Sequence, residues 1–130
     1  MCIRDRPKAM LINGQSSSGG DALPYYFRKL GLGPLIGTRT WGGLIGISGN
    51  PSLADGGLIL APTFRFIDTD GQWAVENEGV APDIEVIDRP DLVAKGQDPS
   101  LERAVEVLLK ALEDNPPETI EVPPAPTDFR

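Results

Sequence analysis

The chain has 130 residues, enough for one domain with its own core but not for two ample ones. Its hydrophobic content of 40% and charged content of 24% are typical of a soluble globular protein, and its net charge of −7 argues against a general binder of nucleic acid or anionic membranes. The single cysteine excludes an internal disulfide, the lack of a cysteine and histidine cluster argues against a structural zinc site, and no apolar run is long enough to span a bilayer.

The first half of the chain predicts short strands and one helix. In order, we expect a strand at 10–12, a helix at 21–30, and strands at 35–37, 44–48, 58–61 and 63–67. The helix has apolar residues at helical spacing, accepts Pro24 in its first turn and stops at Gly31. A turn at Asp70-Gly71 then predicts a hairpin whose second arm is 72–75, and the last strand is expected at 84–86.

The longest predicted helix opens at Asp98-Pro99 and ends at Pro116-Pro117. Its apolar stripe consists of Leu101, Ala104, Val105, Leu108 and Leu112. On another face, Glu106 and Lys110 are expected to pair.

We expect three segments along the chain. Residues 1–9 form a leader outside the fold, 10–115 form the folded part, and 116–130 form a proline-rich flexible tail. The leader lacks the apolar core of a signal peptide, so it is either an unrelated start on a chain that begins partway through a larger gene product or an ordinary disordered N-terminus. The tail is interpreted as a spacer, with partner binding as the alternative.

A stretch rich in serine and glycine, residues 13–21, lies between the first predicted strand and the first predicted helix. A serine at such a turn can expose its hydroxyl, glycine neighbours leave room for a substrate backbone, and the positive end of the helix dipole lies behind it. These are the needs of an activated nucleophile beside an oxyanion site. The alternative is an ordinary turn in which a serine caps the helix.

Three segments, 13–21, 37–43 and 75–83, occur in an order and spacing that resemble a known family. With 30–33, 35–37 and 84–86, they resemble the C-terminal half of the serine-peptidase domain of the tail-specific, or C-terminal processing, family, and most closely its tricorn-type branch. The resemblance covers residues 10 to 112. It implies an α/β fold, a fragment of the crotonase-like sandwich shared with Clp-type proteases, with mixed strands and two main helices.

The resemblance assigns catalytic roles to Ser18, Gly19 and Glu76. Ser18 matches the family nucleophile, and the backbone N–H of Gly19 matches one oxyanion donor, although the tricorn pattern has an acidic residue there. Glu76 matches the glutamate that orients an upstream Ser-His pair, with Glu78 as a nearby competitor and a solvated carboxylate as the alternative reading.

Gly43 decides between two mechanisms within the family. Processing peptidases have a lysine at this position, which serves as the general base of a Ser-Lys dyad, whereas the tricorn-type branch has glycine and uses a Ser-His-Ser-Glu tetrad. This chain has Gly43 and no histidine, so we interpret it as a fragment that lacks the upstream Ser-His pair. The isolated chain is therefore expected to be inactive.

Four other side chains have structural interpretations. Arg39 is expected to pair with a carboxylate such as Asp21 or Glu76 rather than to meet substrate, and Trp41 is expected in the core or in the wall of a substrate groove. Asp68 and Asp70 flank a glycine turn and are interpreted as turn formers rather than metal ligands.

The sequence thus predicts part of a cytoplasmic serine peptidase that cleaves peptides through an acyl-enzyme, without a cofactor or metal, and that forms a homo-oligomer when intact. Nucleic acid and membranes are not expected as partners. The rival hypothesis is a non-catalytic module that docks an extended peptide beside Trp41. An exposed Ser18 hydroxyl near Glu76 favours the peptidase, and a buried Ser18 favours the module.

Overall fold

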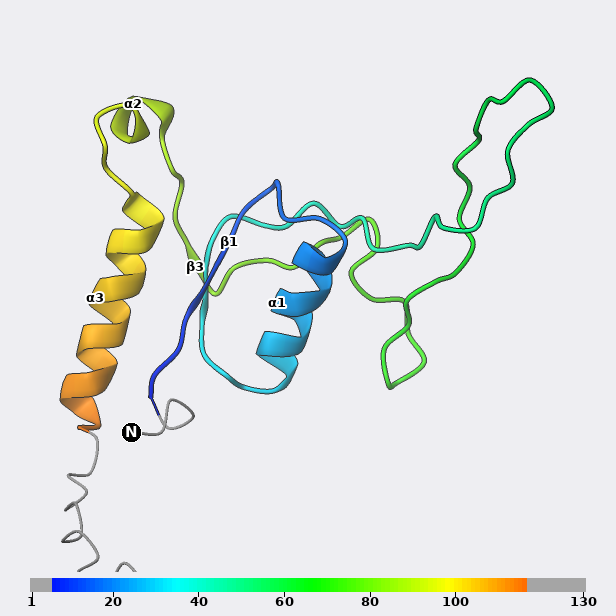
Figure 1. The fold of residues 1–130 in the computed structure, drawn as a ribbon. Coiled ribbons are helices and arrows are strands. Elements are labelled where there is room, and N and C mark those ends of the chain that lie inside the picture. Colours follow the sequence, from blue (N-terminus) through cyan, green and yellow to red (C-terminus); the bar gives the residue numbers. More distant parts are fainter. Residues whose placement is uncertain (1–5, 117–130) are drawn as a thin grey trace, which may run out of the picture.

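The computed structural model describes residues 6–116 (Figure 1). Residues 1–5 of the expected leader and 117–130 of the expected tail lie outside the described residues. Residues 6–9 precede the first strand and are half-buried.

A small parallel sheet lies at the centre of the fold. It has three strands in the order β1 (Met10–Ile12), β2 (Leu35–Gly37) and β3 (Ile84–Glu85). All three run parallel, with Ile12 opposite Gly37 and Ile36 opposite Ile84. The α/β class is confirmed, but the expectation of mixed strands is wrong, because antiparallel pairing within residues 6–116 is limited to isolated bridges.

Gly37 allows β1 and β2 to approach closely where both strands end. Its φ is 124°, and a Cβ atom there would lie 2.1 Å from the carbonyl oxygen of Ile12. Any side chain would therefore push the two strands apart. The chain leaves β1 directly into the serine-rich stretch, so this close pairing fixes where that stretch begins.

Two long helices lie on opposite sides of the sheet (Figure 1). Helix α1 (Gly19–Lys29) connects β1 to β2 and packs on β1, and helix α3 (Pro99–Asp114) packs on β1 and β2. Both helices were expected, whereas the short helix α2 (Pro90–Val93) was not. Asp98 caps α3, because its carboxylate accepts the N–H of Leu101 at 3.0 Å.

The packing face of α3 differs from the predicted stripe. Ala104 is buried and Leu108 and Leu112 are half-buried, but Leu101 and Val105 are about half exposed. The helix meets the sheet along Ser100, Ala104 and the residues one turn further on, so the contact face is rotated from the predicted stripe. The expected pair of Glu106 with Lys110 is also wrong.

Glu106 and Lys110 each form an ion pair with another residue of α3. Arg103 pairs with Glu106 at 2.5 Å, and Lys110 pairs with Asp114 at 3.2 Å. Both pairs keep the spacing of three or four residues that places side chains side by side on a helix.

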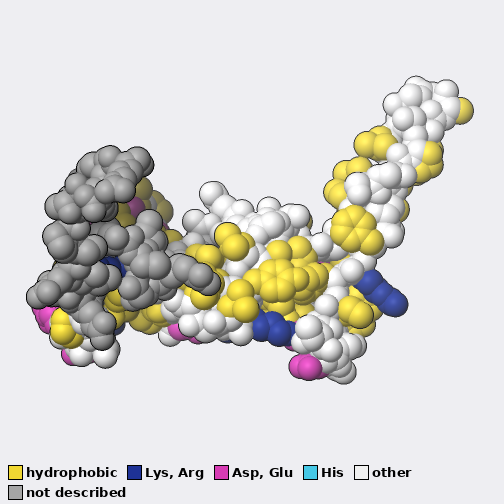
Figure 2. Space-filling model, turned by 60° about the horizontal axis from the view of Figure 1, so that its bottom comes forward, with side chains coloured by type: hydrophobic (Ala, Val, Ile, Leu, Met, Phe, Trp, Pro, Cys, Tyr) yellow, Lys and Arg dark blue, Asp and Glu magenta, His cyan; other side chains and the backbone are white. Residues whose placement is uncertain are grey.

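Residues 46–64 form an extended arm that runs away from the sheet and returns (Figure 1). The strands expected at 44–48, 58–61, 63–67 and 72–75 are wrong as regular strands, because this region makes only three isolated bridges: Gly46 with Phe64, Ser52 with Leu58, and Ile67 with Trp73. Two paired segments that have no third strand beside them and no helix covering them bury little apolar surface and are stabilised little by it. Hydrophobic side chains consequently lie exposed along the arm (Figure 2).

The core is compact and reaches the candidate site. It consists of Ile12, Phe27, Leu35, Val75 and Val80. Two of these, Val75 and Val80, bracket the turn that carries Glu76. The position of that turn therefore depends on the same apolar contacts that hold the sheet against α1.

We predict that Leu35→Ala lowers the free energy of unfolding by about 2–5 kcal/mol, because the leucine is fully buried and its loss leaves a cavity. Leu60→Ala is the matched control, since Leu60 is 60% exposed on the arm, and it should change the value by no more than about 0.5 kcal/mol. Urea unfolding followed by circular dichroism measures both. Equal losses for the two variants would contradict the assigned core.

Candidate active site

Ser18 lies at the N-cap of α1 in an unusual backbone conformation. Its φ is 53° and its ψ is −106°, and its hydroxyl makes no capping hydrogen bond to the helix. A side chain at positive φ costs roughly 1–3 kcal/mol, so the surrounding structure must enforce this conformation. Because its hydroxyl makes no capping hydrogen bond, Ser18 is not an ordinary helix cap.

Ser18 and Gly19 are both exposed residues, and neither the hydroxyl of Ser18 nor the N–H of Gly19 makes a hydrogen bond within residues 6–116. Ser16 behaves differently: its Oγ accepts the N–H of Asn13 at 3.3 Å and helps to form the turn. The structure thus leaves a hydroxyl and an adjacent amide donor available at the start of a helix, where the helix dipole favours negative charge.

Glu76 lies in a tightly wound turn between Val75 and Asn77, whose φ values are 72° and 62°. Positive φ is a genuine outlier for a β-branched residue such as Val75. The half-buried Glu76 carboxylate uses one oxygen, Oε2, to accept the N–H groups of Leu44 and Ile45, each at 2.7 Å. Its other oxygen makes no hydrogen bond within the described residues, so it is free to accept one.

Residues 42–45, which we call the connecting segment, join Ser18 to Glu76. The N–H of Ser18 donates to the carbonyl of Gly43 at 3.1 Å, and the N–H on the other side of that same peptide bond, Leu44, donates to Glu76. Two hydrogen bonds and one peptide unit therefore separate the Ser18 nitrogen from Glu76 Oε2, a path of no more than about 8 Å.

Asp21 holds the other end of the connecting segment. Its side chain is fully buried, Oδ1 accepts the N–H of Gly42 at 2.5 Å, and Oδ2 accepts the N–H of Gly43 at 3.2 Å. Sequence reasoning did not assign this residue to the site, because an acid in the first turn of a helix ordinarily indicates only a favourable interaction with the helix dipole. The structure brings Asp21, Ser18 and Glu76 onto one segment.

Arg39 does not pair with its expected partner, and Trp41 is not in the core, which leaves the wall of a substrate groove as the open alternative for Trp41. Arg39 donates to the backbone carbonyl of Glu78 at 2.9 Å, so its expected pairing with the carboxylate of Asp21 or Glu76 is wrong, although its role is structural. Trp41 is 67% exposed and is therefore not a core residue. Its indole lies so close to Gly43 that a Cβ atom there would be 2.2 Å from the ring.

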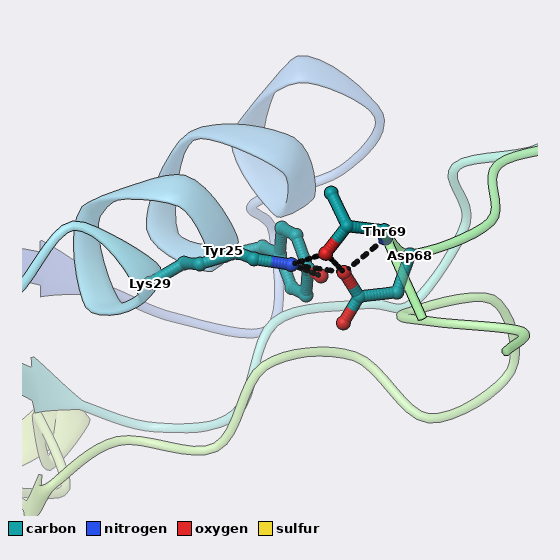
Figure 3. Close-up of polar contacts among 4 residues, drawn as sticks. All are labelled: Tyr25, Lys29, Asp68 and Thr69. Carbon is teal, nitrogen blue, oxygen red and sulfur yellow. Dashed lines mark hydrogen bonds and ion pairs between the residues drawn. The ribbon is translucent and has the colours of Figure 1, made fainter. Parts of the chain in front are cut away.

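A polar cluster attaches the hairpin turn to α1 (Figure 3). Lys29 forms an ion pair with Asp68 and donates to Thr69 Oγ1 at 2.7 Å and to the Tyr25 hydroxyl at 3.3 Å. Asp68 also makes the expected turn, since its carbonyl accepts the N–H of Gly71 at 2.9 Å. Eight residues beyond Asp68 the chain reaches Glu76, so this cluster and the core both restrain the loop that carries it.

The cluster shifts the pKa values of its members. Hydrogen bonds from Lys29 and then Tyr25 hold the pKa of Asp68 well below its usual range, and the bond to Asp68 raises the pKa of Lys29. Desolvation, followed by the neighbouring Asp68, raises the pKa of Tyr25. These shifts favour the charged forms of Lys29 and Asp68.

A cavity of about 530 Å³ lies between α1 and residues 68–81, but Ser18 is not among the residues that line it. The serine instead lies on the open surface. Within residues 6–116, no three acidic, cysteine or histidine side chains are placed to hold a metal ion. In the same part of the chain, every helix is too short or too polar to cross a membrane.

Comparisons with known proteins show the family of the chain. The model of peptidase family S41 matches residues 3–86. Tricorn protease homolog 1 of Streptomyces coelicolor is 44% identical over 113 residues, which cover 87% of this chain and 11% of the relative. The chain belongs to peptidase family S41, and it spans about a tenth of the length of such relatives.

Two solved structures are similar to the fold. The crystal structure of the tricorn protease matches with a TM-score of 0.75 and 41% identity, over 81% of this chain and 10% of that one. The photosystem II D1 C-terminal processing protease matches with a TM-score of 0.54 and 24% identity, over 78% of this chain and 24% of that one, a likeness of fold alone. The expected resemblance to the tricorn and processing proteases is confirmed.

We predict that Asp68→Asn destabilises the protein near neutral pH and that its difference from the wild type shrinks in acid. Because the folded pKa of Asp68 is depressed, the ion pair contributes fully above the unfolded pKa of about 4, and the contribution is lost as the pH falls through the folded value. The raised pKa of Lys29 keeps the pair intact up to about pH 10, above which it is lost.

Urea unfolding at pH 7 and pH 3 measures this effect. Asp70→Asn is the matched control, because Asp70 lies in the same turn and forms no ion pair within the described residues. A difference between the wild type and Asp68→Asn that stays constant with pH would contradict the assigned ion pair.

Proposed function

We propose that this chain supplies the nucleophile side of a serine-peptidase active site. Ser18 is the nucleophile, the N–H of Gly19 is an oxyanion donor, and Glu76 is the carboxylate that orients the catalytic base. One observation carries the proposal: the only non-glycine residues with positive φ in residues 6–116 are Ser18 and the two neighbours of Glu76. Backbone strain of this kind concentrates at functional sites. Here it occurs at Ser18 and beside Glu76, the two places that the connecting segment joins.

The available groups fit acyl transfer. The Ser18 oxygen attacks the peptide carbonyl carbon while the base takes the hydroxyl proton, and the Gly19 N–H stabilises the negative carbonyl oxygen. The C–N bond then breaks as the base returns the proton to the leaving amine, and water hydrolyses the acyl-serine. The Ser18 hydroxyl has no hydrogen bond to break before the first step, because it does not cap the helix, and Ser18 is an exposed residue.

The base in this proposal comes from outside the chain. The sequence contains no histidine, and a lysine in place of Gly43 would collide with the indole of Trp41. The free oxygen of Glu76 is the acceptor to which an incoming Ser-His pair would bind. Glu76 suits this role better than Glu78, since Glu76 binds the segment that holds Ser18, whereas Glu78 interacts with Arg39 through its backbone carbonyl.

The family resemblance contributes the remaining parts of the proposal. Peptides are the substrates, the longer protein is cytoplasmic and homo-oligomeric, and the fragment belongs to a crotonase-like sandwich. The exposed hydroxyl of Ser18 and the unused N–H of Gly19 favour this activity over the non-catalytic peptide-binding module, which would require neither.

We predict that an alkyl fluorophosphonate modifies Ser18 selectively when imidazole is added as an external base. The serine oxygen displaces fluoride and its proton passes to imidazole, which should raise the rate by about tenfold or more. Peptide mapping by mass spectrometry locates the adduct. Ser18→Ala should abolish it, and Ser17→Ala, the matched control at the adjacent exposed serine, should not.

Two results would contradict the proposal. Labelling that survives Ser18→Ala would remove Ser18 as the nucleophile. Without imidazole, the isolated chain is expected to leave peptides uncut, so peptide cleavage that disappears in Ser18→Ala would show that the base lies within these 130 residues.

A further inference from the structure

We propose that Asp21 is a positioning residue that holds Ser18 in its reactive backbone conformation. The inference rests on the proposed role of Ser18 and extends it to a residue that touches neither substrate nor base. Asp21 acts through the connecting segment: its carboxylate fixes the N–H groups of Gly42 and Gly43, and the carbonyl of Gly43 fixes the N–H of Ser18.

Asp21 is a buried acidic residue, which is unfavourable unless other groups compensate for the lost hydration of its carboxylate. A carboxylate removed from water costs several kcal/mol unless hydrogen bonds replace its hydration. Asp21 is fully buried and forms no ion pair within residues 6–116, so two backbone amides and the N-terminal end of α1 replace that hydration. The side-chain hydrogen bonds of the Asp21 carboxylate are therefore made to the connecting segment, at Gly42 and Gly43.

The hydrogen bonds form a closed ring around Ser18. The N–H of Ser18 donates to the Gly43 carbonyl at 3.1 Å, the N–H of Gly43 donates to Asp21 Oδ2 at 3.2 Å, and the N–H of Asp21 donates to the Ser18 carbonyl at 3.0 Å. The N–H of Ser18 is thereby held by Gly43, which the Asp21 carboxylate binds, and the carbonyl of Ser18 is held by the backbone N–H groups of Asp21 and Ala22. Positive φ at a serine is unfavourable, and this ring is what opposes its relaxation.

The direction of the Gly19 N–H depends on the same ring. Gly19 is bonded to Ser18, and the two peptide groups of Ser18 set the orientation of the amide that follows. A relaxed Ser18 would move both its hydroxyl and this oxyanion donor. A displacement of about 1 Å at a reacting group can cost on the order of a hundredfold in rate.

Asp83 provides a matched control for a purely structural role. Its carboxylate also accepts a backbone N–H, that of Leu35 at 2.7 Å, but it does so in the sheet. Asp83 has no hydrogen bond to the connecting segment. Asp21→Asn weakens two carboxylate-to-backbone contacts, those to Gly42 and Gly43. Asp83→Asn weakens one such contact and also the exposed ion pair of Asp83 with Arg28. Only the first substitution weakens the ring around Ser18.

The test uses the full chain and two readouts. Amide hydrogen exchange by NMR follows Ser18 and Leu35, and fluorophosphonate labelling with imidazole follows the Ser18 hydroxyl. In Asp21→Asn we expect exchange at Ser18 to accelerate about tenfold, exchange at Leu35 to stay unchanged, and labelling to fall by about ten- to a hundredfold. In Asp83→Asn we expect exchange to accelerate at Leu35 and to stay unchanged at Ser18, with little change in the labelling of Ser18.

If Asp21→Asn does not fold, amide exchange in the wild-type chain still tests whether the ring exists. The ring requires the amides of Ser18 and Gly43 to be protected together, and free exchange at Ser18 beside a protected Gly43 would overturn the inference. Equal effects of the two variants on exchange and labelling at Ser18 would also overturn it. Absence of Ser18 labelling in the wild type would instead defeat the proposed function, while the exchange data would still test the ring.

Discussion

The connecting segment, residues 42–45, is the element on which the arrangement of the candidate site depends. Its four consecutive N–H groups are all accepted by side-chain carboxylates, the first two by Asp21 and the last two by Glu76. The segment is buried or half-buried, so these groups need partners. No neighbouring strand within the described residues supplies them, and two acids from distant parts of the chain take that place.

The carbonyl groups of the same segment complete the arrangement. Gly43 accepts the N–H of Ser18, and Gly42 accepts the N–H of Asn77 at 2.8 Å. Each carbonyl therefore binds a residue with positive φ, one at the candidate nucleophile and one beside Glu76. Two of the three non-glycine residues with positive φ in the described part of the chain, Ser18 and Asn77, are therefore held by a single stretch of backbone, which helps to explain how a small fold can maintain these costly conformations.

Much of the fold and part of the site follow from local sequence signals. Strands β1 and β2 occur at the predicted positions, where short apolar runs indicate them. Helix α1 occurs at Gly19–Lys29, close to the predicted 21–30, between a turn-forming serine stretch and a glycine stop. The arm could not be predicted as it is, because its apolar residues resemble strands whose partners are not found in residues 6–116. Regular strands depend on such partners more than on their own residues.

Asp21 and Arg39 show why the site was harder to predict than the fold. From the sequence, the opposite charges of Arg39 and of Asp21 or Glu76 suggest that these side chains pair. In the structure Asp21 and Arg39 each bind backbone instead: Asp21 accepts the N–H groups of the buried Gly42 and the half-buried Gly43, which need partners, and Arg39 donates to the carbonyl of Glu78, an exposed residue. That need depends on tertiary contacts, which the local sequence does not contain.

The most direct measurement of the proposed catalytic arrangement is a crystal structure of the chain after reaction with the fluorophosphonate. We expect phosphorus on Ser18 Oγ, a phosphoryl oxygen about 2.7–3.1 Å from the Gly19 nitrogen, and a Ser18 φ that remains positive. We also expect a gap of about 7–10 Å between Ser18 Oγ and the Glu76 carboxylate, because an imidazole and a hydroxyl must fit there with hydrogen bonds. A phosphoryl oxygen turned away from Gly19, or direct contact between Ser18 and Glu76, would contradict the proposed roles of these residues.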